Sequence, residues 1–187
     1  MTVMRNPLAQ INAFAMQNGL VVGIWVLLTQ CAMVGSFTYG VLSMVNLMML
    51  LFTPIMLFLL TRKFRTMVAP TGVFTITQGF LHTLLTTVYA STWVAIGVYV
   101  YLSYFDGGYV FDAYVSYFNR PEVKELLAQK EVQQDLAAAM QGLTLEEVIN
   151  GLRCVPPATY AMMVFYGNLM VSPLLSLIIA ICLRRSK

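Results

Sequence analysis

A stripe of polar side chains marks one apolar stretch as the first place to look for chemistry. Residues Thr75 to Tyr104 contain no Asp, Glu, Lys or Arg, and they include the only histidine of the chain, His82. On a helix with 3.6 residues per turn, five polar side chains of this stretch fall within an arc of about 80°. They are Thr75, Gln78, His82, Thr86 and Tyr89. Such a stripe faces other protein or water rather than lipid.

His82 has two interpretations. In the functional one it carries protons or binds a ligand, and in the structural one it makes a hydrogen bond to a neighbouring helix. The apolar stretches hold no carboxylate to pair with it, and a lone histidine does not build a metal site. The sequence favours the structural interpretation and predicts no catalytic, cofactor-binding or metal-binding residue.

Each of the other apolar stretches carries one amide, at Gln30, Asn46 and Asn168. We expect these amides to bond to one another or to the polar stripe, at about 0.6 to 2 kcal/mol each. Together with Gln78, His82 and Thr86 they form the candidate polar face inside the membrane.

Four helices must position these side chains. Hydrophobic residues make up 59% of the 187 residues and charged residues only 10%, too few charges for a soluble domain of this size. The predicted spans cover about residues 19–34, 41–61, 75–104 and 159–183. We therefore predict an all-α, integral membrane four-helix bundle that forms a single membrane domain over residues 1–187. Before the first span, Met1 to Asn18 is predicted as a helix at the membrane surface.

Two local features refine the packing of these spans. Pro54 removes the hydrogen bond to the carbonyl of Leu50, so Thr53 or a neighbouring helix is expected to supply a new donor. Small residues recur every fourth position at Gly19 and Gly23, and again further along the chain. The second set is Ser172, Ser176 and Ala180. These patterns allow close helix contacts, either within one chain or between two copies.

The hydrated part of the chain lies between the third and fourth spans. All eight acidic residues fall between Asp106 and Glu147, and residues 106–157 are predicted as an amphipathic helical insertion. One helix is expected from Pro121 to about Gln141. A capping box at Thr144 to Glu147 then opens a short helix with four apolar residues on one face. They are Leu145, Val148, Ile149 and Leu152.

Charge predicts the orientation. Four spans bring both termini and the loop between spans two and three to one side, and that side holds seven cations and no acid. They are Arg5, Arg62, Lys63, Arg65, Arg184, Arg185 and Lys187. The positive-inside rule places this side, with both termini, in the cytoplasm and the acidic insertion outside.

Catalytic signatures are missing from the sequence. It contains no Gly-rich phosphate loop, no G-x-S-x-G and no H-E-x-x-H motif. The predicted topology separates His82 from every acid, which excludes a Ser-His-Asp or Cys-His-Asp arrangement. We expect no enzyme and no cofactor. The net charge of +3 gives no basis for nucleic-acid binding.

Several segments together resemble a known family. These are Thr75–Phe80 (TITQGF), Val100–Asp106 (VYLSYFD), the acidic stretch Pro121–Glu147 and the basic tail after the fourth span. In this layout the chain resembles the family called domain of unknown function 4199, from about Gln17 to Arg185. The resemblance implies a bacterial inner-membrane protein with an exposed helical insertion, and it supplies no catalytic residues.

Two functions fit these features. The favoured one is a non-enzymatic membrane scaffold or accessory subunit whose acidic insertion contacts an envelope protein or a second copy. Of the three cysteines, predicted as free thiols, only Cys154 is placed to link to another chain. The alternative is a small transporter or channel subunit in which the His82 stripe lines a path and Pro54 and Pro173 kink their helices.

Overall fold

The computed structural model describes residues 7–70, 72–129, 132, 140 and 142–185 of the chain. These residues are almost entirely helical, and the chain divides into two compact units. The first comprises Met1–Val98 with Ala161–Lys187, and we call it the helical bundle. The second comprises Tyr99–Tyr160, and we call it the acidic unit because it contains every Asp and Glu of the sequence.

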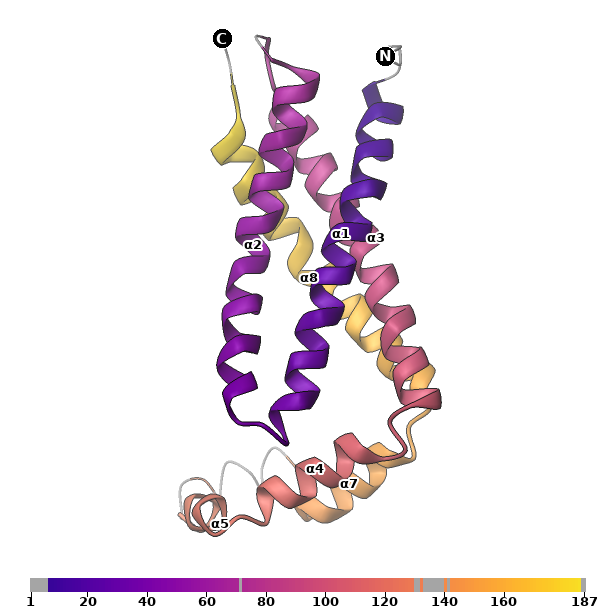
Figure 1. Ribbon diagram of the computed structural model, residues 1–187, viewed down its shortest axis with the longest axis vertical. Coiled ribbons are helices and arrows are strands. Elements are labelled where there is room, and N and C mark those ends of the chain that lie inside the picture. The colour runs from indigo at the N-terminus through magenta and orange to yellow at the C-terminus, as the bar shows by residue number, and fades with distance from the viewer. Residues whose placement is uncertain (1–6, 71, 130–131, 133–139, 141, 186–187) are drawn as a thin grey trace. The chain divides into compact units, whose positions relative to one another are not determined.

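The bundle is built from four long helices, α1 (Pro7–Ser36), α2 (Val41–Val68), α3 (Ile76–Tyr104) and α8 (Pro157–Leu183). All four are long and apolar enough to cross a membrane. The all-α membrane bundle predicted from the sequence is confirmed. The start of α1, the end of α2 and the end of α8 lie at the same end of the bundle (Figure 1).

Helix α1 differs from the prediction at its beginning. A separate surface helix was expected before Gly19, but α1 runs without interruption from Pro7 through the first span. The polar residues of its early turns explain the difference, because they find partners on α3. Asn12 accepts a hydrogen bond from the hydroxyl of Tyr89 at 2.7 Å, and Asn18 contacts His82.

Helix α2 continues through Pro54, and a neighbouring helix supplies donors there, as the sequence predicts. The acceptor is different, however. The hydroxyl of Thr53 donates to the carbonyl of Met49 at 3.0 Å, one residue before Leu50. The indole N–H of Trp25 on α1 reaches both the Met49 carbonyl, at 3.3 Å, and the Thr53 hydroxyl, at 3.2 Å. This contact joins α1 to α2.

Close helix contacts occur inside the bundle at the small residues. A Cβ added at Gly19 would lie 2.4 Å from the Cβ of Tyr89, and one added at Gly23 would lie 2.9 Å from the Cβ of Trp93. A Cβ at Gly79 of α3 would lie 3.2 Å from the Cα of Ala180. Both small-residue patterns are therefore used for packing within this chain, α1 on α3 and α8 on α3.

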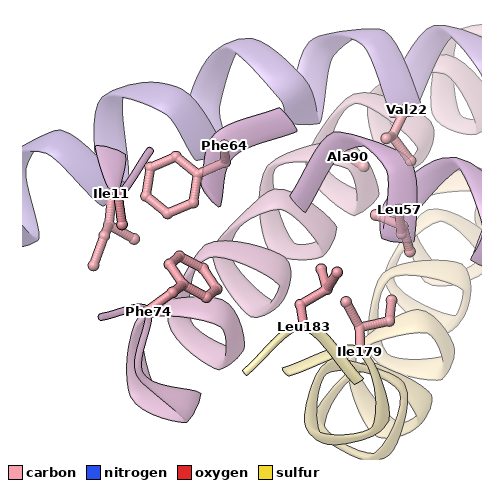
Figure 2. Packing of buried hydrophobic residues seen from close by; sticks show 9 residues of the cluster. Ile11, Val22, Leu57, Phe64, Phe74, Ala90, Ile179 and Leu183 are labelled. Carbon is pink, nitrogen blue, oxygen red and sulfur yellow. The ribbon is translucent and has the colours of Figure 1, made fainter. Parts of the chain in front are cut away.

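An aromatic cluster forms the core near the end of α2. The rings of Phe64 and Phe74, both almost completely buried, meet edge to face with centroids 6.0 Å apart (Figure 2). Phe14 of α1 packs on Phe64 at 5.4 Å, and Ile179 and Leu183 of α8 belong to the same core. The four helices are thus joined at this end by apolar packing.

The described residues of the acidic unit form three short helices, α4 (Tyr109–Phe118), α5 (Pro121–Leu127) and α7 (Leu145–Arg153). The capping box at Thr144 is confirmed: the side chains of Thr144 and Glu147 each accept a hydrogen bond from the other's backbone N–H. The helix predicted from Pro121 to Gln141 is wrong in length. It ends at Leu127, because the Gln129 N–H bonds three residues back, to Leu126, and tightens the last turn.

Further observations on this unit concern the predicted long helix, the turn into α4 and the apolar face of α7. Residues 133–139, which fall in the predicted long helix, lie outside the described residues. The turn into α4 depends on the buried carboxylate of Asp106, which accepts hydrogen bonds from the backbone N–H groups of Gly108 and Val110. On α7, Ile149 is buried within the unit, whereas Leu152 is 42% exposed. An ion pair between Arg153 and Asp112 joins α7 to α4.

Candidate polar site between α1, α2 and α3

His82 lies at the centre of a buried polar cluster in the bundle. Its side chain is 0% exposed. The amide nitrogen of Asn18 on α1 is 3.0 Å from Nε2 of the ring, and the hydroxyl of Thr61 on α2 is 3.1 Å from Nδ1. One imidazole therefore connects three helices through its two nitrogens.

The directions of the hydrogen bonds fix the tautomer of this ring. The hydroxyl of Thr83 donates to the carbonyl of Gly79 at 2.9 Å, so its oxygen is left to accept from Thr61 at 2.9 Å. Because Thr61 spends its single proton on Thr83, it must accept from Nδ1 of His82. The ring then carries its proton on Nδ1, and Nε2 accepts from the Asn18 amide. With a neutral ring, each of these four hydrogen bonds has one donor and one acceptor.

Apolar side chains close the site. The ring of Phe64 stacks on the imidazole, with centroids 4.2 Å apart and planes inclined by 6°. Thr83 and Thr86 are 0% and 1% exposed. The polar cluster is thus enclosed by side chains.

The rest of the predicted stripe divides into separate local roles. Thr75 and Gln78 form a capping box at the start of α3: the Thr75 N–H donates to the Gln78 side chain, and the Gln78 N–H to the Thr75 hydroxyl. The hydroxyl of Thr86 bonds within its own helix, to the carbonyl of His82 at 2.7 Å. Of the five stripe residues, His82 and Tyr89 make side-chain hydrogen bonds to another helix.

The amides predicted on the other helices are not part of this cluster. Gln30, Asn46 and Asn168 are each half-buried. In the described part of the chain, none of them bonds to the stripe or to another of the three. The residues that do meet His82, which are Asn18, Thr61 and Phe64, were missed from the sequence.

The sequence contained a signal for only some of the contacts that the prediction missed. Thr75-Ile76-Thr77-Gln78 has the spacing of a capping box, the same spacing that identified Thr144. Asn18 stands next to Gly19, where α1 comes close to α3. Nothing in the sequence pairs Thr61 with His82, because that contact depends on how α2 and α3 pack.

The contacts that the structure shows at this site are hydrogen bonds made by a neutral ring. Among the described residues, no three His, Cys, Asp or Glu side chains gather where they could hold a metal ion. Cys31, Cys154 and Cys182 are free and exposed. On α8, the buried hydroxyls of Ser172 and Ser176 have no hydrogen-bond partner among the described residues.

Four apolar spans, three of them joined by buried polar contacts, define a multi-pass α-helical membrane protein. A family model described as protein of unknown function (DUF4199) matches residues 14–185, nearly the whole chain. The chain belongs to this family, and the resemblance seen in the sequence is confirmed. Neither the curated proteins nor the solved structures include a match to this chain.

Proposed function

We propose that this protein is a non-enzymatic scaffold or accessory subunit of the bacterial inner membrane, and that its acidic unit contacts a partner protein or a second copy. The observation that carries the proposal is the set of large apolar side chains that the acidic unit leaves exposed beyond the spans. Leu126, Leu143 and Leu152 are 58%, 53% and 42% exposed. A contiguous apolar patch on a hydrated segment marks an interaction surface, and the proposal assigns these side chains to such a patch.

On α7, fewer apolar residues are free for contact than the sequence predicted. Of its four apolar residues, Ile149 is covered within the unit and Leu145 and Val148 are half-covered. Leu152 remains exposed, beside the exposed Cys154. The predicted contact surface therefore centres on the end of α7.

The orientation in this proposal follows from charge. Both termini and the end of α2 lie in the cytoplasm, since cations gather there without any acid, and the acidic unit lies outside the membrane. The partner is therefore an envelope protein or the same unit of another copy.

A transport path along the His82 stripe receives less support. His82, Thr83 and Thr86 are all enclosed, and the ring's two nitrogens are both hydrogen-bonded within the bundle. A path for a solute would require α1 or α2 to move away from α3.

Disulfide crosslinking through Cys154 tests the proposal. We would replace Cys31 and Cys182 with alanine, oxidise native membranes, and look for a discrete Cys154-linked dimer or heteromer. The matched control keeps Cys182 instead of Cys154. The proposal predicts a product with Cys154 only, and predicts that Leu152→Asp reduces it.

Two results would overturn the proposal. One is a purified protein that is monodisperse and monomeric while Cys154 captures nothing. The other is a Cys154 product that Leu152→Asp leaves unchanged, because the contact would then not use the exposed face of α7.

A further inference from the structure

Cations gather at one end of the helical bundle without any acidic neighbour. Arg62, Lys63 and Arg65 lie in the last two turns of α2, and Arg184 and Arg185 follow α8. We call these five residues the basic end. Every acidic residue of the sequence falls between Asp106 and Glu147, in the other unit. The basic end therefore has no Asp or Glu side chain within its own unit to balance it.

Backbone contacts hold the two parts of the basic end together. Phe74 and Arg185 exchange two backbone hydrogen bonds, at 3.0 and 3.1 Å, where the chain enters α3 and leaves α8. Arg185 also donates from its side chain to the carbonyl of Pro70 at 3.1 Å. Arg65 donates to the carbonyl of Leu183 at 3.1 Å. The ends of α2 and α8 are thus fixed side by side, as Figure 1 shows for the two helices.

Two exposed cations flank these anchored guanidinium groups. Arg62 lies one turn before Arg65, on the same face of α2, and Arg184 directly follows Leu183. The side chain of neither residue makes a hydrogen bond or an ion pair with any described residue. The helix dipole favours a cation at Arg65, which lies in the last turn of α2. This effect fades within one turn and does not reach Arg62.

The position of Arg62 along α2 sets its depth in a bilayer. The apolar part of α2 from Val41 to Thr61 is about 32 Å long at 1.5 Å per residue. The hydrocarbon core of a bilayer is about 30 Å thick, so Arg62 emerges at the level of the lipid headgroups. Arg184 occupies the equivalent place after α8.

We propose that the basic end binds the phosphate of an anionic phospholipid headgroup, held by Arg62 and Arg184 on either side of the anchored Arg65. Guanidinium groups bind phosphate oxygens with two parallel hydrogen bonds. The excess of positive charge selects a headgroup with a net negative charge over a zwitterionic one. This site is separate from the contact surface on α7.

Native mass spectrometry of the purified full chain tests the site. The detergent-solubilised protein is titrated with phosphatidylglycerol or with phosphatidylcholine, and the apparent Kd of the first bound lipid is measured. The variant is Arg62→Gln/Arg184→Gln. The matched control, Arg120→Gln/Lys124→Gln, removes two cations from the acidic unit. A third titration adds inorganic phosphate in competition.

We expect phosphatidylglycerol to bind more tightly than phosphatidylcholine. The variant should raise the apparent Kd for phosphatidylglycerol about thirtyfold, because each of the two cations contributes about 1 kcal/mol, a factor of about five. The control changes the Kd less than twofold, and millimolar phosphate does not compete. Equal binding of the two lipids, equal loss in variant and control, or displacement by free phosphate would each overturn the proposal. An unchanged melting temperature without added lipid shows that the variant is folded.

Discussion

Replacing His82 tests whether the buried polar cluster holds the bundle together. In His82→Ala, the Asn18 amide and the Thr61 hydroxyl each lose a partner, and Phe64 loses the ring stacked on it. A hydrogen bond between helices in a membrane contributes about 0.6 to 1.7 kcal/mol. The ring pair adds about 0.5 to 1.5 kcal/mol. We therefore expect the free energy of unfolding to fall by about 2 to 5 kcal/mol.

Two further substitutions separate the nitrogens of the ring. In His82→Asn, the amide nitrogen takes the place of Nδ1 and can donate to Thr61. In His82→Gln, the amide oxygen takes the place of Nε2 and can accept from Asn18. Each variant should recover about 0.6 to 1.7 kcal/mol relative to alanine. Adding Asn18→Ala should then cost stability in the glutamine variant and almost nothing in the asparagine variant.

Reversible unfolding by SDS in mixed micelles, followed by tryptophan fluorescence, measures these differences, since Trp25 and Trp93 both lie in the bundle. Thr92→Ala is the control, because Thr92 is exposed and its hydroxyl bonds only to its own helix, at the carbonyl of Val88. A loss below 0.5 kcal/mol for His82→Ala, on the order of the control, would refute the structural role. So would equal effects of Asn18→Ala in both backgrounds.

Three other predictions concern single contacts. Gly19→Ala should lower the free energy of unfolding by about 1 to 3 kcal/mol, because the added Cβ would meet Tyr89. The control Gly167→Ala adds a Cβ that meets nothing and should be neutral or stabilising, so equal losses in the two variants would contradict the close contact of α1 with α3. Trp25→Phe should lower the free energy of unfolding by about 0.6 to 1.7 kcal/mol, because it removes the N–H that joins α1 to α2. An unchanged free energy of unfolding would show that this hydrogen bond is not formed. Hydrogen bonds from the backbone N–H and hydroxyl of Thr144 lower the pKa of Glu147, so its contribution to α7 is present above the ordinary carboxyl pKa and is lost as the pH falls through the lowered value. Hydrogen exchange of α7, corrected for the intrinsic rate, should therefore increase at acid pH in the wild type. A Glu147→Gln variant, which has no carboxyl group to titrate there, with the same acid response would contradict this.

The sequence predicted the helices because their signals are local. Long apolar stretches without charge identify spans whatever their neighbours are, and the capping box at Thr144 lies within four residues. The helix after Pro121 shows the limit of this approach. Its pattern extends to Gln141, but α5 ends at Leu127, where the last turn tightens.

The candidate site was predicted less completely. Periodicity placed His82 on a face that meets protein or water rather than lipid, and in the structure its side chain is buried among protein groups. Its partners Asn18 and Thr61 are 64 and 21 residues away in sequence, and helical spacing says nothing about such pairs. The amides at Gln30, Asn46 and Asn168 share the chemistry of a buried network, but the packing of the helices leaves them apart from His82.

Labelling two cysteine positions from opposite sides of the membrane tests the proposed orientation most directly. In a protein without other cysteines, an impermeant maleimide is applied to sealed right-side-out membranes, with either the natural Cys154 or a Lys63→Cys substitution present. Both positions are exposed in the structure. We predict that Cys154 is labelled at once, and that the Lys63→Cys position is labelled only after the membranes are opened. Labelling of the Lys63→Cys position in sealed membranes, with Cys154 protected, would contradict the orientation and the topology drawn from the charges.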